Sequence, residues 1–297
     1  MRLRWRRLTA PLRERVVVRR ELARLGTPVT FQEKVRYKML ADRRPLLTTF
    51  ADKLAVRDYV ASRVGSDVLT DVYLVTDCAD DLATATLPRE YVVKPTHASG
   101  ACVAVADFAP ADTALPASPD GFTGHLVQPG NASADGLVAL CRLWLARDYR
   151  RHEEWCYRDV PHRILVEELL ADDGAIPNDI KLSVFHGRVR LIQVELDRFS
   201  RHARSFYSPE WERLDVSVRK YPSGGEVPRP AMLDEMVRIA EVLGRNTDYV
   251  RVDLFGIGER IVFGELTNYP EAGRVDFVPP GFDRELGRWW TPPKRYR

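Results

Sequence analysis

Long apolar runs and a strong charge of one sign are both missing from this sequence. No stretch approaches the roughly 20 apolar residues that a membrane-spanning helix needs. The one apolar run near the start, Val16-Val17-Val18, is too short for the core of an export signal. The net charge of +3 gives no reason by itself to expect nucleic acid or a membrane as the partner. We therefore expect a cytoplasmic protein with no transmembrane segment that does not bind nucleic acid.

Cysteine is also scarce. The four cysteines, Cys78, Cys102, Cys141 and Cys156, lie far apart, and none forms a CxxC pair. This spacing predicts neither a zinc site nor a disulfide framework. We expect all four to be small buried apolar residues or inert thiols.

Basic residues are nevertheless crowded at the start of the chain. The opposing acids there are Glu14 and Glu21. We expect a solvated basic helix or arm, and peripheral contact with an anionic polymer, lipid headgroups or another subunit stays open. The arginines are Arg2, Arg4, Arg6, Arg7, Arg13, Arg15, Arg19, Arg20 and Arg24.

At 297 residues, with 45% hydrophobic and 29% charged side chains, the chain can bury a substantial core and form one enzyme-sized unit of two or three lobes. Residues 106–133, rich in Pro, Asp, Gly and Ala, are expected to be a loop-dominated connection. Apolar periodicity predicts the other elements. The expected strands are 73–75, 91–94, 102–105, 163–170, 180–185, 189–195, 250–255 and 261–268, and the expected helices are 51–64, 137–149 and 232–243.

The last two strands each carry one carboxylate in an otherwise apolar run, Asp253 in the first and Glu265 in the second. A buried carboxylate needs a cation or hydrogen bonds to compensate it. A hairpin through residues 256–260 sets the two acids opposite each other or one diagonal step apart, with Thr267 and Asn268 nearby. These oxygen ligands suit Mg²⁺ better than zinc or copper, and Arg251 shares the strand face of Asp253. A structural salt-bridge ladder on an exposed sheet face would produce the same pattern.

Four features follow one another along the chain: Lys53 at a helix start, Lys94 at a strand end, the acidic turn Glu167-Glu168, and the Asp253/Glu265 hairpin. This order resembles the ATP-grasp fold. Five segments between about residues 28 and 288 are similar to the TupA-like ATP-grasp family, which is associated with teichuronopeptide and other polysaccharide biosynthesis. They are Phe31-Gln32-Glu33-Lys34, Ala51 to Arg57, Val92 to Gly100, Gln193 to Phe199 and Val250 to Asp253.

The resemblance implies an α+β fold in which two lobes of antiparallel sheet, with helices, clasp ATP. It divides the chain into a basic helical segment with a short preceding region (1–49), an N-lobe with the phosphate flap and a helical connection (50–165), and a C-lobe with the Mg²⁺-binding hairpin (166–297). Two features depart from the wider fold. Thr267 stands where an Asn commonly follows the metal-binding Glu by two residues, and the N-terminal lobe of classical peptide ligases is mostly missing before Lys53.

The resemblance also implies individual roles. Lys53 and Lys94 would contact the nucleotide phosphates as compact cations. A flap of small residues over 96–100 would bring backbone N–H groups close to those phosphates. The remaining implied contacts are His97, Ser99 and Gly100 in the flap, Glu167, Glu168 and Leu169 at adenine, Asp179 at the ribose, Lys181 at phosphate or adenine, and Asp253, Glu265, Thr267 and Asn268 at Mg²⁺.

The implied activity is that of a carboxylate–amine ligase. A substrate carboxylate attacks the γ-phosphate of ATP, and an amine then displaces phosphate from the acyl phosphate. Arg251 would hold the transferred phosphoryl group, and the guanidinium forks of Arg198 and Arg204 would hold the carboxylate or acyl phosphate. An exposed basic loop over 197–204 is the alternative for the last two.

The expected substrates are small-molecule, glycan or peptide carboxylates and amines in the assembly of cell-surface polysaccharides or secondary metabolites. Two other functions stay open. One is an ATP-grasp phosphotransferase acting on a sugar or small molecule, and the other is a non-catalytic module that binds an anionic polymer. The sequence leaves the identity of donor and acceptor and the oligomeric state undecided.

Overall fold

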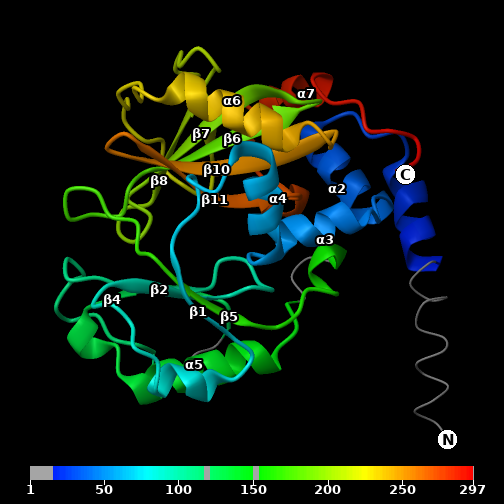
Figure 1. Cartoon of the computed structure of the whole chain (residues 1–297). Helices are drawn as coiled ribbons and strands as arrows, with labels where there is room; N and C mark the ends of the chain where they lie inside the picture. Colours follow the sequence, from blue (N-terminus) through cyan, green and yellow to red (C-terminus); the bar gives the residue numbers. More distant parts are fainter. Residues whose placement is uncertain (1–15, 117–120, 150–153, 297) are drawn as a thin grey trace, which may run out of the picture.

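The computed structural model describes residues 16–116, 121–149 and 154–296. Two five-stranded sheets, each covered by helices, form two lobes that face each other (Figure 1). The described part of the basic opening, residues 16–25, is helical, and its arginines Arg19, Arg20 and Arg24 are exposed. The earlier arginines lie outside the described residues. None of the described helices is both long enough and apolar enough to cross a membrane.

The first sheet has the strand order β1-β5-β2-β3-β4. Its strands are β1 (Val72–Thr76), β2 (Tyr91–Pro95), β3 (Cys102–Val105), β4 (Gly124–Val127) and β5 (Ile164–Glu167). The expected hairpin of β2 with β3 is confirmed, but β4 was wrongly included in the expected loop of 106–133. Because β4 pairs with β3 in parallel, this sheet is mixed rather than purely antiparallel. A parallel pair needs a long connection between its two strands. The short strand β4 follows such a connection, rich in turn-forming residues, so its sequence pattern does not stand out.

The second sheet has the order β11-β10-β6-β7-β8, and all its strands are antiparallel. Two predicted hairpins are confirmed, β6 (Asp179–Phe185) with β7 (Arg188–Leu196) and β10 (Tyr249–Ile257) with β11 (Arg260–Thr267). The strand β8 (Ala203–Tyr207) begins inside the segment that the exposed-loop alternative covered. The predicted helix over 232–243 is α6 (Leu233–Gly244), which lies over this sheet in Figure 1. Its buried Leu233, Met236, Ile239 and Leu243 follow helical spacing.

Three helices precede the first strand: α2 (Phe31–Ala41), α3 (Pro45–Ala51) and α4 (Ala55–Val64). A capping box between Thr30 and Glu33 starts α2. The helix expected over 51–64 begins only at Ala55, because the Asp52 carboxylate accepts from the backbone N–H of Leu54 at 2.8 Å and the chain turns there. Lys53 therefore lies in the turn between α3 and α4.

Packing moves the boundary that the sequence suggested between the lobes. Phe50, Val56, Val60 and Val68 pack into the core under the second sheet, together with α6. Residues 50–68 were assigned to the N-lobe, yet their apolar side chains join the C-lobe core. The other division, at 165/166, cuts β5 two residues before its end. The N-lobe built on the first sheet thus begins after α4.

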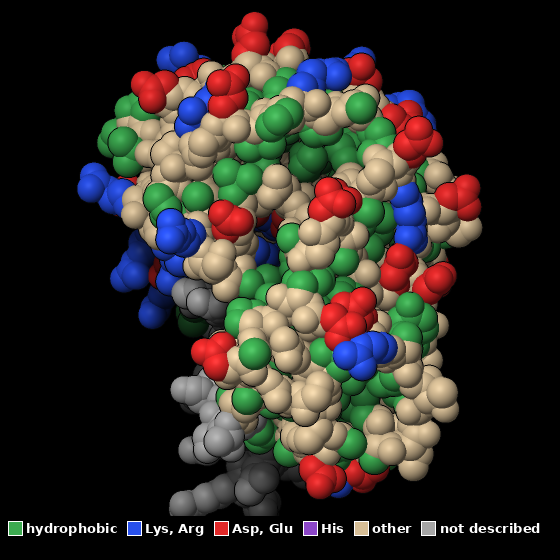
Figure 2. All heavy atoms as spheres, turned by 90° about the vertical axis from the view of Figure 1, so that its left-hand side faces the viewer, with side chains coloured by type: hydrophobic (Ala, Val, Ile, Leu, Met, Phe, Trp, Pro, Cys, Tyr) green, Lys and Arg blue, Asp and Glu red, His purple; other side chains and the backbone are tan. Residues whose placement is uncertain are grey.

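The first sheet is covered by α5 (Ala134–Ala146), which the structure places three residues earlier than the expected 137–149. Ser133 caps this helix, and Trp144 is buried between it and the sheet. The remaining elements are the 3-10 helices η1 (Ala79–Ala83), η2 (Pro129–Asn131), η3 (Trp155–Tyr157) and η4 (Pro270–Gly273), the short strands β9 (Ser217–Val218) and β12 (Phe277–Val278), and the helix α7 (Gly281–Arg288). Figure 2 shows the molecule hollowed between its two lobes, with acidic and basic side chains visible in the recess.

Candidate active site

A cleft between the two sheets collects most of the predicted site residues. Lys53, Lys94, Leu169, Asp179 and Glu265 all line this inter-sheet cleft. A second cavity continues from it on the far side of Glu265, and Ser99, Lys181 and Arg251 line that second cavity. Gly100, Arg198 and Glu265 line both. Segments far apart in the sequence are thus brought to one place by the two sheets.

The two hairpin acids lie opposite each other, as the sequence predicts. Asp253 pairs with Glu265, and Arg251 pairs with Thr267, in the register of β10 and β11. The Arg251 guanidinium donates to both oxygens of Asp253 at 2.7 Å, to Glu265 Oε1 at 3.1 Å and to Thr267 Oγ1 at 2.9 Å. Thr267 in turn donates to Glu265 Oε1 at 3.0 Å. Arg251 therefore stands between the two carboxylates and holds them in place.

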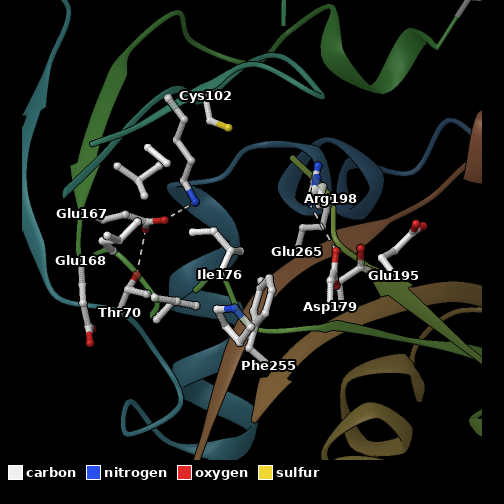
Figure 3. A pocket seen from close by; sticks show the side chains of 18 of the residues that line it. Thr70, Cys102, Glu167, Glu168, Ile176, Asp179, Glu195, Arg198, Phe255 and Glu265 are labelled. Carbon is white, nitrogen blue, oxygen red and sulfur yellow. Dashed lines mark hydrogen bonds and ion pairs between the residues drawn. The ribbon is translucent and has the colours of Figure 1, made fainter. Parts of the chain in front are cut away.

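Lys181 joins this group from the neighbouring strand. It pairs with Asp253 in the register of β6 and β10, and its Nζ lies 2.5 Å from both Asp253 Oδ2 and Asp179 Oδ2. Arg198 reaches Asp179 Oδ2 from the other side, at 3.4 Å (Figure 3). The second oxygen of Asp179 is buried and has no hydrogen-bond partner among the described residues. That acceptor is open to a donor from a ligand, such as a ribose hydroxyl.

The charges around Glu265 suit a Mg²⁺ ion that is bound together with a phosphate group. Burial works to raise the pKa of Glu265, but Arg251, Lys181, Lys53 and Arg198 outweigh it and hold that pKa well below its usual range. Glu265 is therefore an ionised oxygen donor, and 39% of its side chain is exposed. Within the described residues, no three Cys, His, Asp or Glu side chains gather as a self-sufficient metal site. Asp253 and Glu265 are the residues that would hold such an ion.

Two lysines form the opposite wall of the cleft. Lys94 Nζ forms an ion pair with Glu167, which also accepts from Thr70 Oγ1 at 2.8 Å (Figure 3). Lys53 Nζ donates to the carbonyl oxygen of Ala98, in the flap. Burial lowers the pKa of Lys53 to about 8, partly offset by Glu265. These contacts position both cations beside the cleft.

Two of the predicted contacts are not brought to the site. His97 is fully buried, and its Nε2 donates to the carbonyl oxygens of Trp144 and Arg147, at 3.1 and 3.2 Å. Its ring stacks on His162 with centroids 3.8 Å apart, on the α5 side of the flap. Asn268 follows Thr267 and points to the opposite strand face, where its amide donates to the Leu47 carbonyl at 2.8 Å. Neither side chain lines the inter-sheet cleft or the second cavity.

The strand-to-turn at the end of β5 lines the cleft with Glu167, Glu168 and Leu169. The Glu168 backbone N–H donates to Asp71 O at 2.9 Å, and its carboxylate pairs with Arg260 at 2.6 Å. Arg260 belongs to the hairpin of the second sheet, so this ion pair joins the two lobes at the edge of the cleft. Glu168 consequently has a structural partner that its sequence position does not suggest.

Arg204 lies in the wall of the second cavity, but its guanidinium is already engaged. It contacts Glu195 Oε1 at 2.9 Å and Glu271 Oε1 at 2.7 Å, and it lies 4.1 Å from the centroid of the Tyr221 ring. Sequence reasoning missed Glu195, His202, Tyr221 and Glu271, which line this cavity. A signal was present for one of them: His202 lies just before β8 and two residues from the predicted Arg204, which is the spacing of side chains on one strand face.

Comparison with known proteins identifies the family. The family model described as TupA-like ATPgrasp matches residues 33–290. This match confirms the ATP-grasp fold and the TupA-like resemblance expected from the sequence. None of the curated proteins matches the chain.

Solved structures are similar at a lower level. D-alanine–D-alanine ligase from Bacillus anthracis is 13% identical, with a TM-score of 0.39 over 75% of this chain and 58% of that chain. The ADP complex of N5-carboxyaminoimidazole ribonucleotide synthetase is 12% identical, with a TM-score of 0.42 over 76% and 46%. The ATP-grasp ligase PsnB, complexed with its precursor peptide and AMPPNP, is 12% identical, with a TM-score of 0.37 over 91% and 63%. The chain thus spans less than two thirds of the length of each.

Proposed function

The chain belongs to the TupA-like ATP-grasp family, and from this premise we propose that it is an ATP- and Mg²⁺-dependent carboxylate–amine ligase. The reaction passes through an acyl phosphate. Its setting is the assembly of a cell-surface polysaccharide or a secondary metabolite, as the family resemblance implies. The substrates are a carboxylate and an amine on a small molecule, glycan or peptide.

One observation carries the proposal. A single cleft has two lysines on one wall, Lys53 and Lys94, and the ionised Glu265 beside Arg251 on the other. Cations on both sides of one space suit a polyanion such as a nucleotide triphosphate. The apolar side chains at the same cleft, among them Leu169, Ile176 and Phe255, suit the adenine ring (Figure 3). A module that only bound a polymer would have no use for this buried arrangement.

Each group of charged side chains at the cleft has its own proposed role. Lys53 and Lys94 would bind phosphate oxygens from the first wall. Arg251 and Arg198 would neutralise charge on the transferred phosphoryl group and orient the attacking carboxylate, since a guanidinium holds such groups in a fork. Asp253 and Glu265, with the Thr267 hydroxyl nearby, would hold Mg²⁺, whose charge would offset that of the phosphates. Enclosure between the two lobes would keep water away from the acyl phosphate.

The first test measures Mg²⁺-dependent ADP release by the wild type and by Glu265→Gln. The panel crosses acidic sugars and amino acids with amines. We expect ADP release to need both an acid and an amine, and to fall at least about 10³-fold in Glu265→Gln because an ionised oxygen donor is lost. Glu259→Gln, in the exposed turn of the same hairpin, is the matched control and should retain wild-type activity.

The outcomes separate the alternatives. ADP release that needs only a hydroxyl substrate and leaves a phosphorylated product would replace the ligase by a phosphotransferase. Failure of the folded wild type to bind ATP with Mg²⁺ would remove the proposal entirely. Equal activity in Glu265→Gln and the wild type would remove the proposed metal site.

A further inference from the structure

The second cavity carries a histidine that the activity described so far does not use. His202 lies just before β8, lines this cavity and has 23% of its side chain exposed. Its Nε2 is hydrogen-bonded to Glu195, which lines both the second cavity and the inter-sheet cleft. The pair therefore lies beside the space that Glu265, Arg251 and Arg198 share.

Glu195 is held firmly in place. It accepts from Gln193 Nε2 at 2.5 Å and from Arg204 Nε at 3.0 Å, in addition to His202. Burial works to raise its pKa, but Arg204 and Lys181 outweigh burial and, together with the hydrogen bonds from His202 and Arg204, lower the pKa of Glu195 to about 2. An ionised carboxylate can only accept hydrogen bonds. The ring nitrogen that faces it, His202 Nε2, must therefore be a donor.

This contact determines the tautomer of a neutral His202. With the proton on Nε2, the lone pair is on Nδ1. No hydrogen-bond partner for Nδ1 exists among residues 16–116, 121–149 and 154–296. A carboxylate that orients an imidazole through one nitrogen and leaves the other free is the arrangement of an oriented general base.

The other groups around the ring hold it without competing for Nδ1. From β7 comes Glu195, and from β8 comes Arg204, which shares the Glu195 carboxylate. Tyr221 packs its ring against His202 with centroids 4.3 Å apart, and Arg204 and Lys220 lie against that same tyrosine ring. Glu271 pairs with Arg204 at 2.7 Å. Each carboxylate near His202 thus already has a cationic partner.

We propose that His202 is the general base that removes the proton from the attacking amine, with Glu195 as its positioning residue. The inference rests on the proposed ligase function. The amine nitrogen adds to the acyl carbon of the acyl phosphate, and a C–N bond forms. The bond from that carbon to the phosphate oxygen breaks, and its electron pair leaves with the phosphate. The nitrogen's proton passes to His202 Nδ1 and from there to the released phosphate or to water.

The test compares two nucleophiles that differ in their need for a base. Hydroxylamine is largely unprotonated at neutral pH and traps acyl phosphates as hydroxamates without help. Ammonium and glycine are protonated there and need a base. The substitution is His202→Gln, because a glutamine amide placed at Nε2 can still donate to Glu195 but offers no basic nitrogen. Each variant is assayed with ATP, Mg²⁺ and the acid panel, with either hydroxylamine or ammonium chloride plus glycine.

We expect His202→Gln to lower the amide-forming rate with ammonium and glycine at least about 100-fold at neutral pH. Hydroxamate formation should stay close to the wild-type rate. The defect should shrink as the pH is raised, because more of the amine is then free base. Glu195→Gln should show the same selective defect in milder form, since a neutral amide orients the ring less strictly. His186→Gln, at the opposite end of the β6–β7 hairpin, should behave as the wild type.

Two results would overturn the assignment of His202. Equal loss of hydroxamate and amide would mean that the side chain only supports the fold, and no selective loss of amide would mean that another group takes the proton. Absence of hydroxamate from the wild type itself would instead count against the ligase proposal.

Discussion

Among the described residues, the two walls of the inter-sheet cleft hold their charges differently. On the first wall, Lys94 is paired with Glu167 and Lys53 donates to one carbonyl in the flap. On the second wall, the carboxylates of Asp179, Asp253 and Glu265 line the cleft. Lys181 and Arg251, which line the second cavity, each contact two of these carboxylates. A cation with one partner can exchange that partner for a ligand. A network in which each cation contacts two carboxylates keeps its geometry when the ligand leaves. The comparison suggests that the first wall binds and the second wall positions, and four experiments test it.

The largest effect is expected from Lys181→Met on the second wall. The substitution leaves the buried carboxylates of Asp179 and Asp253 facing each other without the cation between them. We expect a loss of about 3–5 kcal/mol in the free energy of unfolding, together with loss of ADP release. Denaturant unfolding and the ADP assay measure the two. A variant as stable as the wild type would show that the network does not hold this wall together.

Lys94→Met on the first wall is expected to separate binding from stability. Glu167 keeps its hydrogen bond from Thr70 and lies 3.6 Å from Arg57, so the fold should lose far less than in Lys181→Met. Loss of a charge-assisted contact should raise the Kd for ATP about 10-fold to 100-fold. Calorimetric titration with ATP and Mg²⁺ measures this, and Lys294→Met, outside the cleft, is the control. An unchanged Kd would contradict a binding role for the first wall.

The pH dependence of nucleotide binding should report the charge state of Lys53. Burial lowers its pKa from 10.5 to about 8, so in the free protein the side chain loses its charge as the pH rises through that value. We expect ATP affinity to fall above about pH 8 in the wild type and to fall less in Lys53→Arg, because a guanidinium stays charged. The same lowered pKa means that the unfolded chain binds more protons between pH 8 and 10.5, so stability should rise with pH there. Parallel pH profiles for the two proteins would contradict the assignment.

The smallest effect is expected from His97, which lies behind the first wall. Burial and the neighbouring His162 lower its pKa from 6.5 to about 4. The folded protein therefore binds fewer protons than the unfolded chain between these values, and stability should be lost as the pH falls from about 6.5 to 4. His97→Gln should flatten this part of the stability profile while leaving the Kd for ATP near that of the wild type. A large change in ATP affinity would contradict this and support a role for His97 in phosphate binding.

Local patterns were enough for the parts of the site that lie on one hairpin. The pairing of Asp253 with Glu265 and the shared face of Arg251 follow from strand alternation and a short turn, and the structure has that register. The same alternation places Asn268 on the opposite strand face, away from the two acids, because it directly follows Thr267. There it meets the Leu47 carbonyl of α3, a contact between residues far apart in the chain.

The sequence by itself determined the family, the two hairpins of the second sheet and the residue types proposed to bind ATP, because short-range motifs and spacing specify each of these. The tertiary structure decided what the spacing cannot encode. Packing of Phe50 and Val56 under the second sheet assigned residues 50–68 to the other lobe, and pairing of β7 with β8 brought Glu195 to His202. Burial, partners and ionisation depend on which distant segments meet, and only the folded chain brings those segments together.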